Sequence, residues 1–305
     1  MAKYIFKRIV ISIITLYILA TIVFFLMKIM PGGPFDTDLI TDPRVLAQIY
    51  AQFNLDQPLN VQYFLYMRNL ARGNLGESFR RPATVNNSIA ILFPVTLRLG
   101  SVAFIYAVTA GIGMGTLAAL TKVRAIRNVV LAIVTAGVSI PGFLLGLFLL
   151  YIFAIHFQIL PAIGLRTWRH FIMPAMALSF FPIAFISRMT RSVLTEVMRQ
   201  DYIVMARAKG LSRRVVIFKH ALKNALLPII TYMGPMMAYM MVGSFVVETL
   251  FAIPGIGREF VSSVQARDYP MIMGMAIFLG AFIILMNLIV DILYGFIDPR
   301  IKIQK

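Results

Sequence analysis

Residues 99–120, LGSVAFIYAVTAGIGMGTLAAL, contain no charged side chain and are long enough to cross a membrane. A helix of about 20 apolar residues spans the ~30 Å hydrocarbon core of a bilayer. Small residues recur at every fourth position of this stretch, at Ala107, Gly111, Gly115 and Ala119. They share one helix face, and small residues on such a face let two membrane helices approach closely. The stretch therefore predicts a transmembrane helix in tight contact with a neighbour.

Five further apolar runs indicate that the whole chain is a membrane protein. Of its 305 residues, 60% are hydrophobic and 13% are charged, whereas soluble domains are about 45–50% apolar and about 25% charged. The runs cover residues 9–27, 129–155, 171–186, 225–247 and 271–290. They are apolar on all sides, which favours helices over transmembrane strands, because such strands alternate apolar and polar residues. We expect one all-α membrane domain, residues 1–305, with six transmembrane helices.

Prolines and glycines inside these runs predict local features of the bundle. Glycines at positions 142 and 146 repeat the small-residue spacing in the third run. Prolines remove a backbone donor and interrupt or kink helices. Those expected to do so are Pro141, Pro174, Pro182, Pro228 and Pro235.

The distribution of basic residues predicts how the chain is oriented in the membrane. The N-terminus, the two segments around 122–127 and 188–223, and the C-terminus together hold 18 of the 29 Lys and Arg residues. Cytoplasmic segments next to the membrane are enriched in Lys and Arg. We therefore expect both termini in the cytoplasm and residues 30–97 as a long extracytoplasmic loop. This topology accounts for the net charge of +17 and disfavours the competing explanation, nucleic-acid binding.

The outer loop contains the stretch NLDQPLNVQYFLYMRNLARGNLGESF, residues 54–79. Asp56 is expected to cap a helix that Gly73 ends. Its apolar face would consist of Leu59, Tyr63, Phe64, Met67 and Leu70. Two interpretations remain open: the helix lies on the bilayer or on neighbouring spans, or it provides a docking surface for an external partner.

The sequence contains none of the common catalytic or metal-binding motifs. There is no GxxxxGK(S/T) phosphate loop, no HExxH and no GxSxG, and the chain has no cysteine. The three histidines, His156, His170 and His220, are far apart in the sequence. Asp291 is the one acid near the end of an apolar run, and proton-coupled carriers usually need carboxylates at mid-depth. We expect no catalytic residue, metal or cofactor in this chain, and an energy source outside it.

Residues 206–228, ARAKGLSRRVVIFKHALKNALLP, overlap the basic segment 196–224, which is predicted to be a docking loop. A helix from 196 to 206 would end at Gly210 in the left-handed conformation, and Ser212 would cap the next helix. The short side chains at 206, 208 and 210 would form a low ridge that fits a groove on another protein. Basic residues beside it could meet an acidic rim. The alternative is a basic interfacial helix on anionic lipid.

This loop resembles the cytoplasmic coupling loop of binding-protein-dependent ABC importer permeases. The matching residues are Ala206-Arg207-Ala208-Lys209-Gly210-Leu211, His220-Ala221-Leu222 and Leu227-Pro228. The general form of that loop reads EAA, then three residues, Gly, nine residues and IxLP. Val204, Met205 and Lys223 depart from it. They match the variant of oligopeptide and dipeptide importers. PVTLRLG (94–100), ETLFAIPGIGREFVSSVQARDYP (248–270) and the outer stretch 54–79 are similar to the same group.

The resemblance implies the type I importer permease fold and a role in a larger assembly in a prokaryotic plasma membrane. The chain would be the first of two permease subunits, importing oligopeptides or dipeptides. The alternative cargo is nickel, glutathione or another small solute. A weaker alternative for the whole chain is a carrier that works without partner subunits. The implied partners are a second permease, two ATPase subunits that bind ATP and Mg²⁺, and an external peptide-binding protein. The implied ATPase-coupling residues are Ala206, Arg207, Ala208, Lys209, Gly210, Leu211, Arg213, Arg214, His220 and Leu222.

Two further regions are candidates for the transport pathway and its outer mouth. The fifth run is rich in methionine, whose flexible side chain suits varied cargo; the residues are Met233, Met236, Met237, Met240 and Met241. Ordinary core packing is the alternative. The segment 248–269 is expected either to contact the binding protein or form an outer gate, or to be a structural re-entrant loop. Its candidate contact residues are Glu248, Pro254, Gly255 and Gly257.

Overall fold

The computed structural model describes residues 2–30, 33–35 and 43–297, and these residues form an all-helical bundle. Their only bridge of the β type pairs Glu77 with Thr84. Five helices are long and apolar enough to cross a membrane, and a sixth span is possible if one bent pair is counted. The five are α1 (Ala2–Ile29), α4 (Val85–Leu120), α7 (Ile172–Val197), α10 (Leu222–Val242) and α13 (Tyr269–Ile297). The expected fold class is confirmed.

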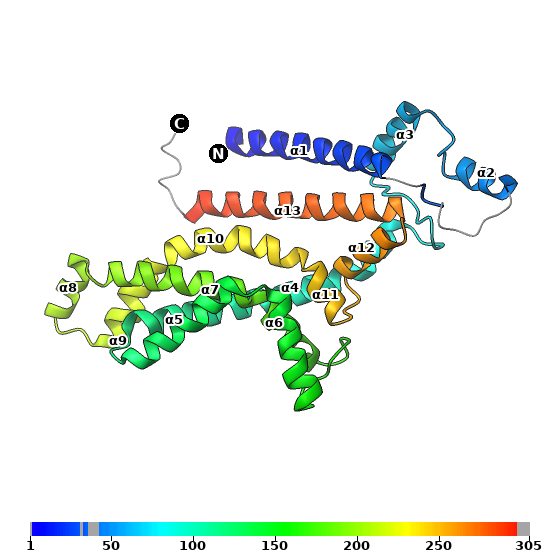
Figure 1. The fold of residues 1–305 in the computed structure, drawn as a ribbon. Coiled ribbons are helices and arrows are strands. Elements are labelled where there is room, and N and C mark those ends of the chain that lie inside the picture. The colour runs from blue at the N-terminus through cyan, green and yellow to red at the C-terminus, as the bar shows by residue number, and fades with distance from the viewer. Residues whose placement is uncertain (1, 31–32, 36–42, 298–305) are drawn as a thin grey trace.

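The third apolar run is broken at Pro141, as expected from that proline, so no single straight helix covers residues 129–155. It forms α5 (Arg124–Ser139), α6 (Gly142–Leu149) and the π-helix η1 (Leu150–His156), with a bend of 112° between α5 and the rest. Ile140 is extended, with φ −93° and ψ 122°. Steric contact with the ring of Pro141 favours that conformation in the preceding residue. In Figure 1, α6 accordingly leaves the bundle at a steep angle.

Close packing of α4 on α7 forms the centre of the bundle, as the small-residue stripe predicts. A Cβ atom on Gly115 would lie 2.6 Å from the carbonyl oxygen of Ser187, and one on Gly111 would lie 2.8 Å from Ile186. The Ser187 hydroxyl also donates to the Gly111 carbonyl at 3.0 Å. α7 continues past the expected end at residue 186 as far as Val197, with Arg188 and Arg191 inside the helix.

The remaining elements gather at the two ends of the bundle. α8 (Asp201–Ala208), α9 (Arg213–Val215) and the π-helix η3 (Val216–Ala221) form one end, which we name the coupling end. The opposite, outer end in Figure 1 holds α2 (Pro43–Gln52), α3 (Leu59–Ala71), α11 (Phe245–Leu250) and α12 (Ile256–Gln265). A 3₁₀ helix, η2 (Trp168–Phe171), precedes α7. α1 packs beside α13 along one side of the bundle.

The outer helix α3 packs on a neighbouring span, which supports the first interpretation of its apolar face. The hydroxyls of Tyr63 and Thr21 are hydrogen-bonded at 2.8 Å. Leu59 and Phe64 remain exposed. Gly73 follows the helix with φ +74° as expected, but the expected cap is wrong, because Pro58 precedes the helix and no side chain caps it. Residues 31–32 and 36–42 of the expected outer loop, and the basic C-terminal residues 298–305, lie outside the described residues.

Candidate functional site

The loop at the coupling end is a short helix closed by a glycine turn. α7 stops at Val197 and α8 starts at Asp201, so the expected continuous helix over 196–206 is wrong. At the other end of α8 the amide of Gly210 donates to the Arg207 carbonyl at 2.9 Å, and that of Leu211 to the Ala206 carbonyl at 3.3 Å. These two bonds define a Schellman motif.

Gly210 is required by its backbone conformation and not by lack of space. Its φ is +76°, in the left-handed region that the sequence predicts. A Cβ atom at this position would meet no heavy atom within 4 Å. Other L-residues lose roughly 1–2 kcal/mol in this conformation. The position therefore faces open space, and a substitution there changes the backbone energy without causing a steric clash.

The predicted ridge of small residues is wrong at Ala206. Ile203 and Ala206 are one helical turn apart and buried, and they pack with Leu194, Val216 and Ala221 in a small core. These contacts fix α8 against the bundle. Ala208 and Gly210 remain exposed as expected. Ala206 therefore positions the loop and offers no surface to another protein.

The exposed residues of this loop include large apolar side chains and not only the small ones that were predicted. Its exposed hydrophobic side chains, which we name the coupling surface, are Tyr202, Val204, Met205, Leu211, Val215 and Phe218. Met205 is 58% exposed and Phe218 is 65% exposed. Exposed apolar side chains in a segment outside the apolar runs suit contact with another protein. Three of the six are singled out in the sequence: Leu211 as a coupling residue, and Val204 and Met205 as departures from the general loop pattern.

Basic residues border the coupling surface and have no acidic partner within the described part of the chain. They are Arg207, Lys209, Arg213, Arg214 and Lys219, all exposed. Arg213 donates to the Leu120 carbonyl at 3.2 Å, which ties the loop to the end of α4. The surface is therefore suited to an apolar groove with an acidic rim.

The two remaining predicted coupling residues lie where the loop joins α10. His220 and Leu222 are half-buried. Asn224 connects this junction to α8, because its Nδ2 atom donates to the Tyr202 hydroxyl and to the His220 carbonyl, both at 3.0 Å. Ser212 precedes α9, but its side chain makes no capping bond, contrary to the expectation. A π-helix such as η3 is rare and occurs often at functional sites.

At the outer end, Glu248 is an internal anchor and not a surface contact. Its side chain is fully buried, and Oε2 accepts from the amides of Gly257 at 2.8 Å and Arg258 at 3.1 Å. The next amide, that of Ile256, donates to Oγ1 of Thr96 at 2.9 Å. Gly255 and Gly257 are buried as well, so Pro254 is the one exposed residue of the four expected contacts. Burial of the other three excludes them as direct contacts of a binding protein in this structure and favours a structural role.

The methionines of α10 are divided between core and surface. Met236 and Met240 are buried in the main core, which supports core packing for these two residues. Met233, Met237 and Met241 are half-buried. The expectation that the methionine face lines a pathway is therefore wrong for Met240.

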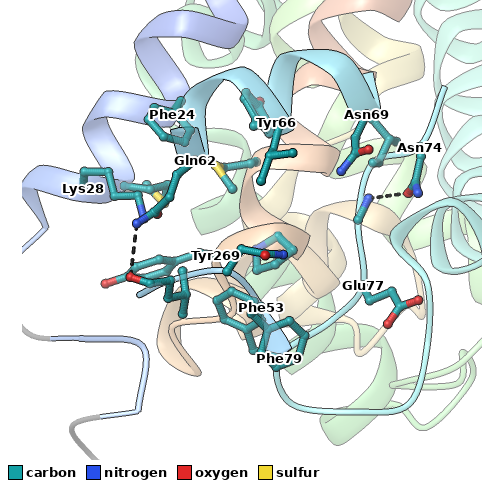
Figure 2. Close-up of a pocket in the computed structure, with 18 of the residues that line it drawn as sticks. Phe24, Lys28, Phe53, Gln62, Tyr66, Asn69, Asn74, Glu77, Phe79 and Tyr269 are labelled. Carbon is teal, nitrogen blue, oxygen red and sulfur yellow. Dashed lines mark hydrogen bonds between the residues drawn. The ribbon is translucent and has the colours of Figure 1, made fainter. Parts of the chain in front are cut away.

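An outer cavity of about 320 Å³, which the sequence analysis did not foresee, lies between α1, α3 and α13. In Figure 2, Phe53 and Phe79 lie together on one side of it, with Tyr66 and Asn69 of α3 on the other. Burial raises the pKa of the Tyr66 phenol above its usual value. A hydrogen bond joins two segments next to this cavity, because the Ser78 hydroxyl donates to the buried carboxylate of Asp268.

The described residues contain no cluster of three His, Cys, Asp or Glu side chains that could hold a metal ion. What they form is a multi-pass membrane protein that exposes an apolar, basic surface at one end. Family models agree: one for the binding-protein-dependent transport system inner membrane component matches residues 111–303, and one for the N-terminal part of such membrane components matches residues 1–100. The chain belongs to this family of transport system inner membrane components.

Similar proteins extend over the full chain. The dipeptide transport system permease protein DppB of Bacillus subtilis is 40% identical, covering 100% of this chain and 99% of that protein. The oligopeptide transport system permease protein OppB of Haemophilus influenzae is 43% identical, covering 99% and 100%. A crystal structure of an amino acid ABC transporter matches with a TM-score of 0.52 at 16% identity, over 70% of this chain and 94% of that chain. At this identity the likeness concerns the fold alone.

Proposed function

We propose that this chain is a transmembrane subunit of an ATP-driven importer of oligopeptides or dipeptides. The observation that carries the proposal is similarity of 40% and 43% over the full length to permeases named for dipeptide and oligopeptide transport. The similarity includes both ends of the bundle, so it covers the docking loop as well as the spans. The absence of a phosphate-loop motif from the sequence agrees with an ATPase in separate subunits.

In this proposal the coupling surface receives an ATPase subunit. Apolar side chains such as Met205 and Phe218 would enter a groove, and exposed cations such as Arg207 and Lys209 would meet its acidic rim. ATP and Mg²⁺ bind to the two ATPase subunits. Their closure would push on α8, and the core around Ile203 and Ala206 would carry the movement into α7 and α10.

The distribution of basic residues gives the orientation of the chain in the membrane. The coupling end carries the larger share of basic residues, so it lies in the cytoplasm together with both termini. The outer end, with α3 and the turn at Pro254, then faces the compartment from which peptide arrives. An external binding protein delivers the peptide there, and a second, related permease completes the pathway.

The test is to tag this chain, extract it in mild detergent and identify by mass the proteins that accompany it. We expect a second permease, two phosphate-loop ATPases and a binding protein that holds peptide. Recovery of this chain alone, with transport in liposomes without ATP, would overturn the importer assignment. A binding protein loaded with nickel or glutathione would overturn the peptide assignment alone.

A further inference from the structure

Two arginines on α7 border a second cavity, at the coupling end of the bundle. The cavity has a volume of about 300 Å³ and lies between α4, α5 and α7. Arg188 and Arg191 are three residues apart on α7, so both side chains leave the same face of the helix. Neither arginine forms a salt bridge within the described residues. The cavity therefore brings two cations together without an acidic counter-ion from the described part of the chain.

The other walls of this cavity are mostly apolar. Val130, Leu131 and Val134 of α5 line it, and Thr135 adds a hydroxyl at its edge. The outward face of α5 continues this apolar surface, because Ile126, Val129 and Ile133 are exposed. A ligand that fits such a site has an anionic group for the arginines and a hydrocarbon part for α5.

The depth of the site matches the headgroup layer of the membrane. Arg188 follows directly after the apolar run 171–186, so the guanidinium groups lie near the end of the hydrocarbon core. Two further cations are at the same end: Lys122 lies between α4 and α5, and Arg127 is in the first turn of α5. Basic pockets between transmembrane helices on this side of a membrane bind the headgroups of anionic lipids.

We propose that this cavity binds one anionic phospholipid, with its phosphodiester on Arg188 and Arg191 and an acyl chain along α5. Planar guanidinium groups bind two phosphate oxygens at once, and a phosphodiester is the anionic group that phospholipids place at this depth. The lipid would fasten α5 to α7 beside the helices that carry the coupling loop. Lipid retention does not depend on which solute the protein transports, so this inference and the peptide assignment can fail separately.

The experiment is native mass spectrometry of the assembled complex, purified through this chain and titrated with phosphatidylglycerol. We expect one tightly retained lipid, and roughly 30-fold weaker retention in the double variant R188Q/R191Q, since each basic residue near a membrane contributes about a factor of five. The matched control is R124Q/R199Q, which removes two charges from the same end but none from the cavity. Equal loss in both variants, or none in either, would overturn the proposal.

A second measurement uses the unaltered chain, in case the double variant fails to assemble. A photoreactive phosphatidylglycerol should crosslink to α5 around Val130–Val134 and to α7 around Arg188–Arg191. Inorganic phosphate in excess should not displace it. Displacement by phosphate, which would indicate a free anion, or crosslinks confined to other helices, which would indicate that a partner subunit covers the cavity, would each overturn the proposal.

Discussion

The two ends of the bundle treat polar groups in opposite ways. At the outer end, buried side chains of Glu248, Thr96 and Asp268 accept hydrogen bonds from neighbouring segments of the same chain. At the coupling end, Met205 and Phe218 are exposed, and the cations beside them have no acidic partner within the described residues. The outer end thus pairs several buried polar groups within this chain, whereas the coupling end has the composition of half an interface.

This difference predicts that substitutions at the outer end affect stability, whereas substitutions at the coupling end affect binding to a partner. A buried carboxylate loses its hydration, and the amide donors that surround Glu248 offset that cost. Removing it should therefore destabilise the fold. The exposed residues of the coupling surface make few contacts inside the chain, so changing them should alter association and leave folding nearly unchanged.

The largest effect is expected at Gly210, where the coupling loop turns. The variant Gly210→Trp places a Cβ atom in the left-handed conformation and a bulky ring on an exposed face. We expect peptide uptake in whole cells to fall to background, while the chain stays in the membrane. Gly210→Asn is the matched control, because asparagine tolerates this conformation, and it should retain uptake. Normal uptake by Gly210→Trp would contradict the coupling role.

The next effect is on stability and concerns Glu248. Glu248→Ala would remove the acceptor of the buried Gly257 amide and of the partly buried Arg258 amide. Each unsatisfied group costs about 1–3 kcal/mol, so we expect a loss of roughly 2–5 kcal/mol, seen as a lower thermal midpoint of the complex in detergent.

The control for this prediction is the isosteric change Glu248→Gln, whose amide oxygen still accepts hydrogen bonds. It should lose clearly less stability than Glu248→Ala. Equal midpoints for Glu248→Ala and the unaltered chain would show that the outer end does not depend on this anchor.

A smaller effect is expected from polar substitutions on the coupling surface. Phe218→Ser should weaken ATPase binding by about tenfold, because burying a phenylalanine side chain contributes about 1.5–3 kcal/mol and only part of it is free to be buried. Phe64→Ser is the matched control, since Phe64 is 64% exposed at the outer end and Phe218 is 65% exposed. Affinity for the ATPase subunits, measured on the purified permeases, should change in the first variant alone. Equal weakening in both would remove the distinction between the two ends.

Parts of this arrangement follow from the sequence because they depend on local physics. The stripe containing Gly111 and Gly115 predicts close helix packing, since the spacing alone places small residues on one face. Gly210 is predicted to end α8 because few other residues accept its backbone conformation. Both features need only neighbouring residues, and both are confirmed.

Other parts depend on contacts between distant segments and could not be predicted. Periodicity groups Ala206 with Met205, but only the packed core around Ile203 shows that Ala206 faces inward. The turn that encloses Glu248 is held by Thr96, which belongs to another helix and accepts from the Ile256 amide. Hydropathy identifies the run 129–155 but contains no information on the angle at Pro141.

The smallest effect is expected from the ion pair between Arg81 and Glu259 at the outer end. The Arg81 side chain is 47% exposed, and exposed pairs usually contribute about 0.2–1 kcal/mol. A double-mutant cycle with Arg81→Gln and Glu259→Gln, read from thermal midpoints, should give a coupling energy in that range that falls as salt is added. A larger, salt-independent value would mean that water is excluded around this pair. The ion pair at the surface of the outer end would then contribute to stability on the same scale as the hydrogen bonds of Glu248.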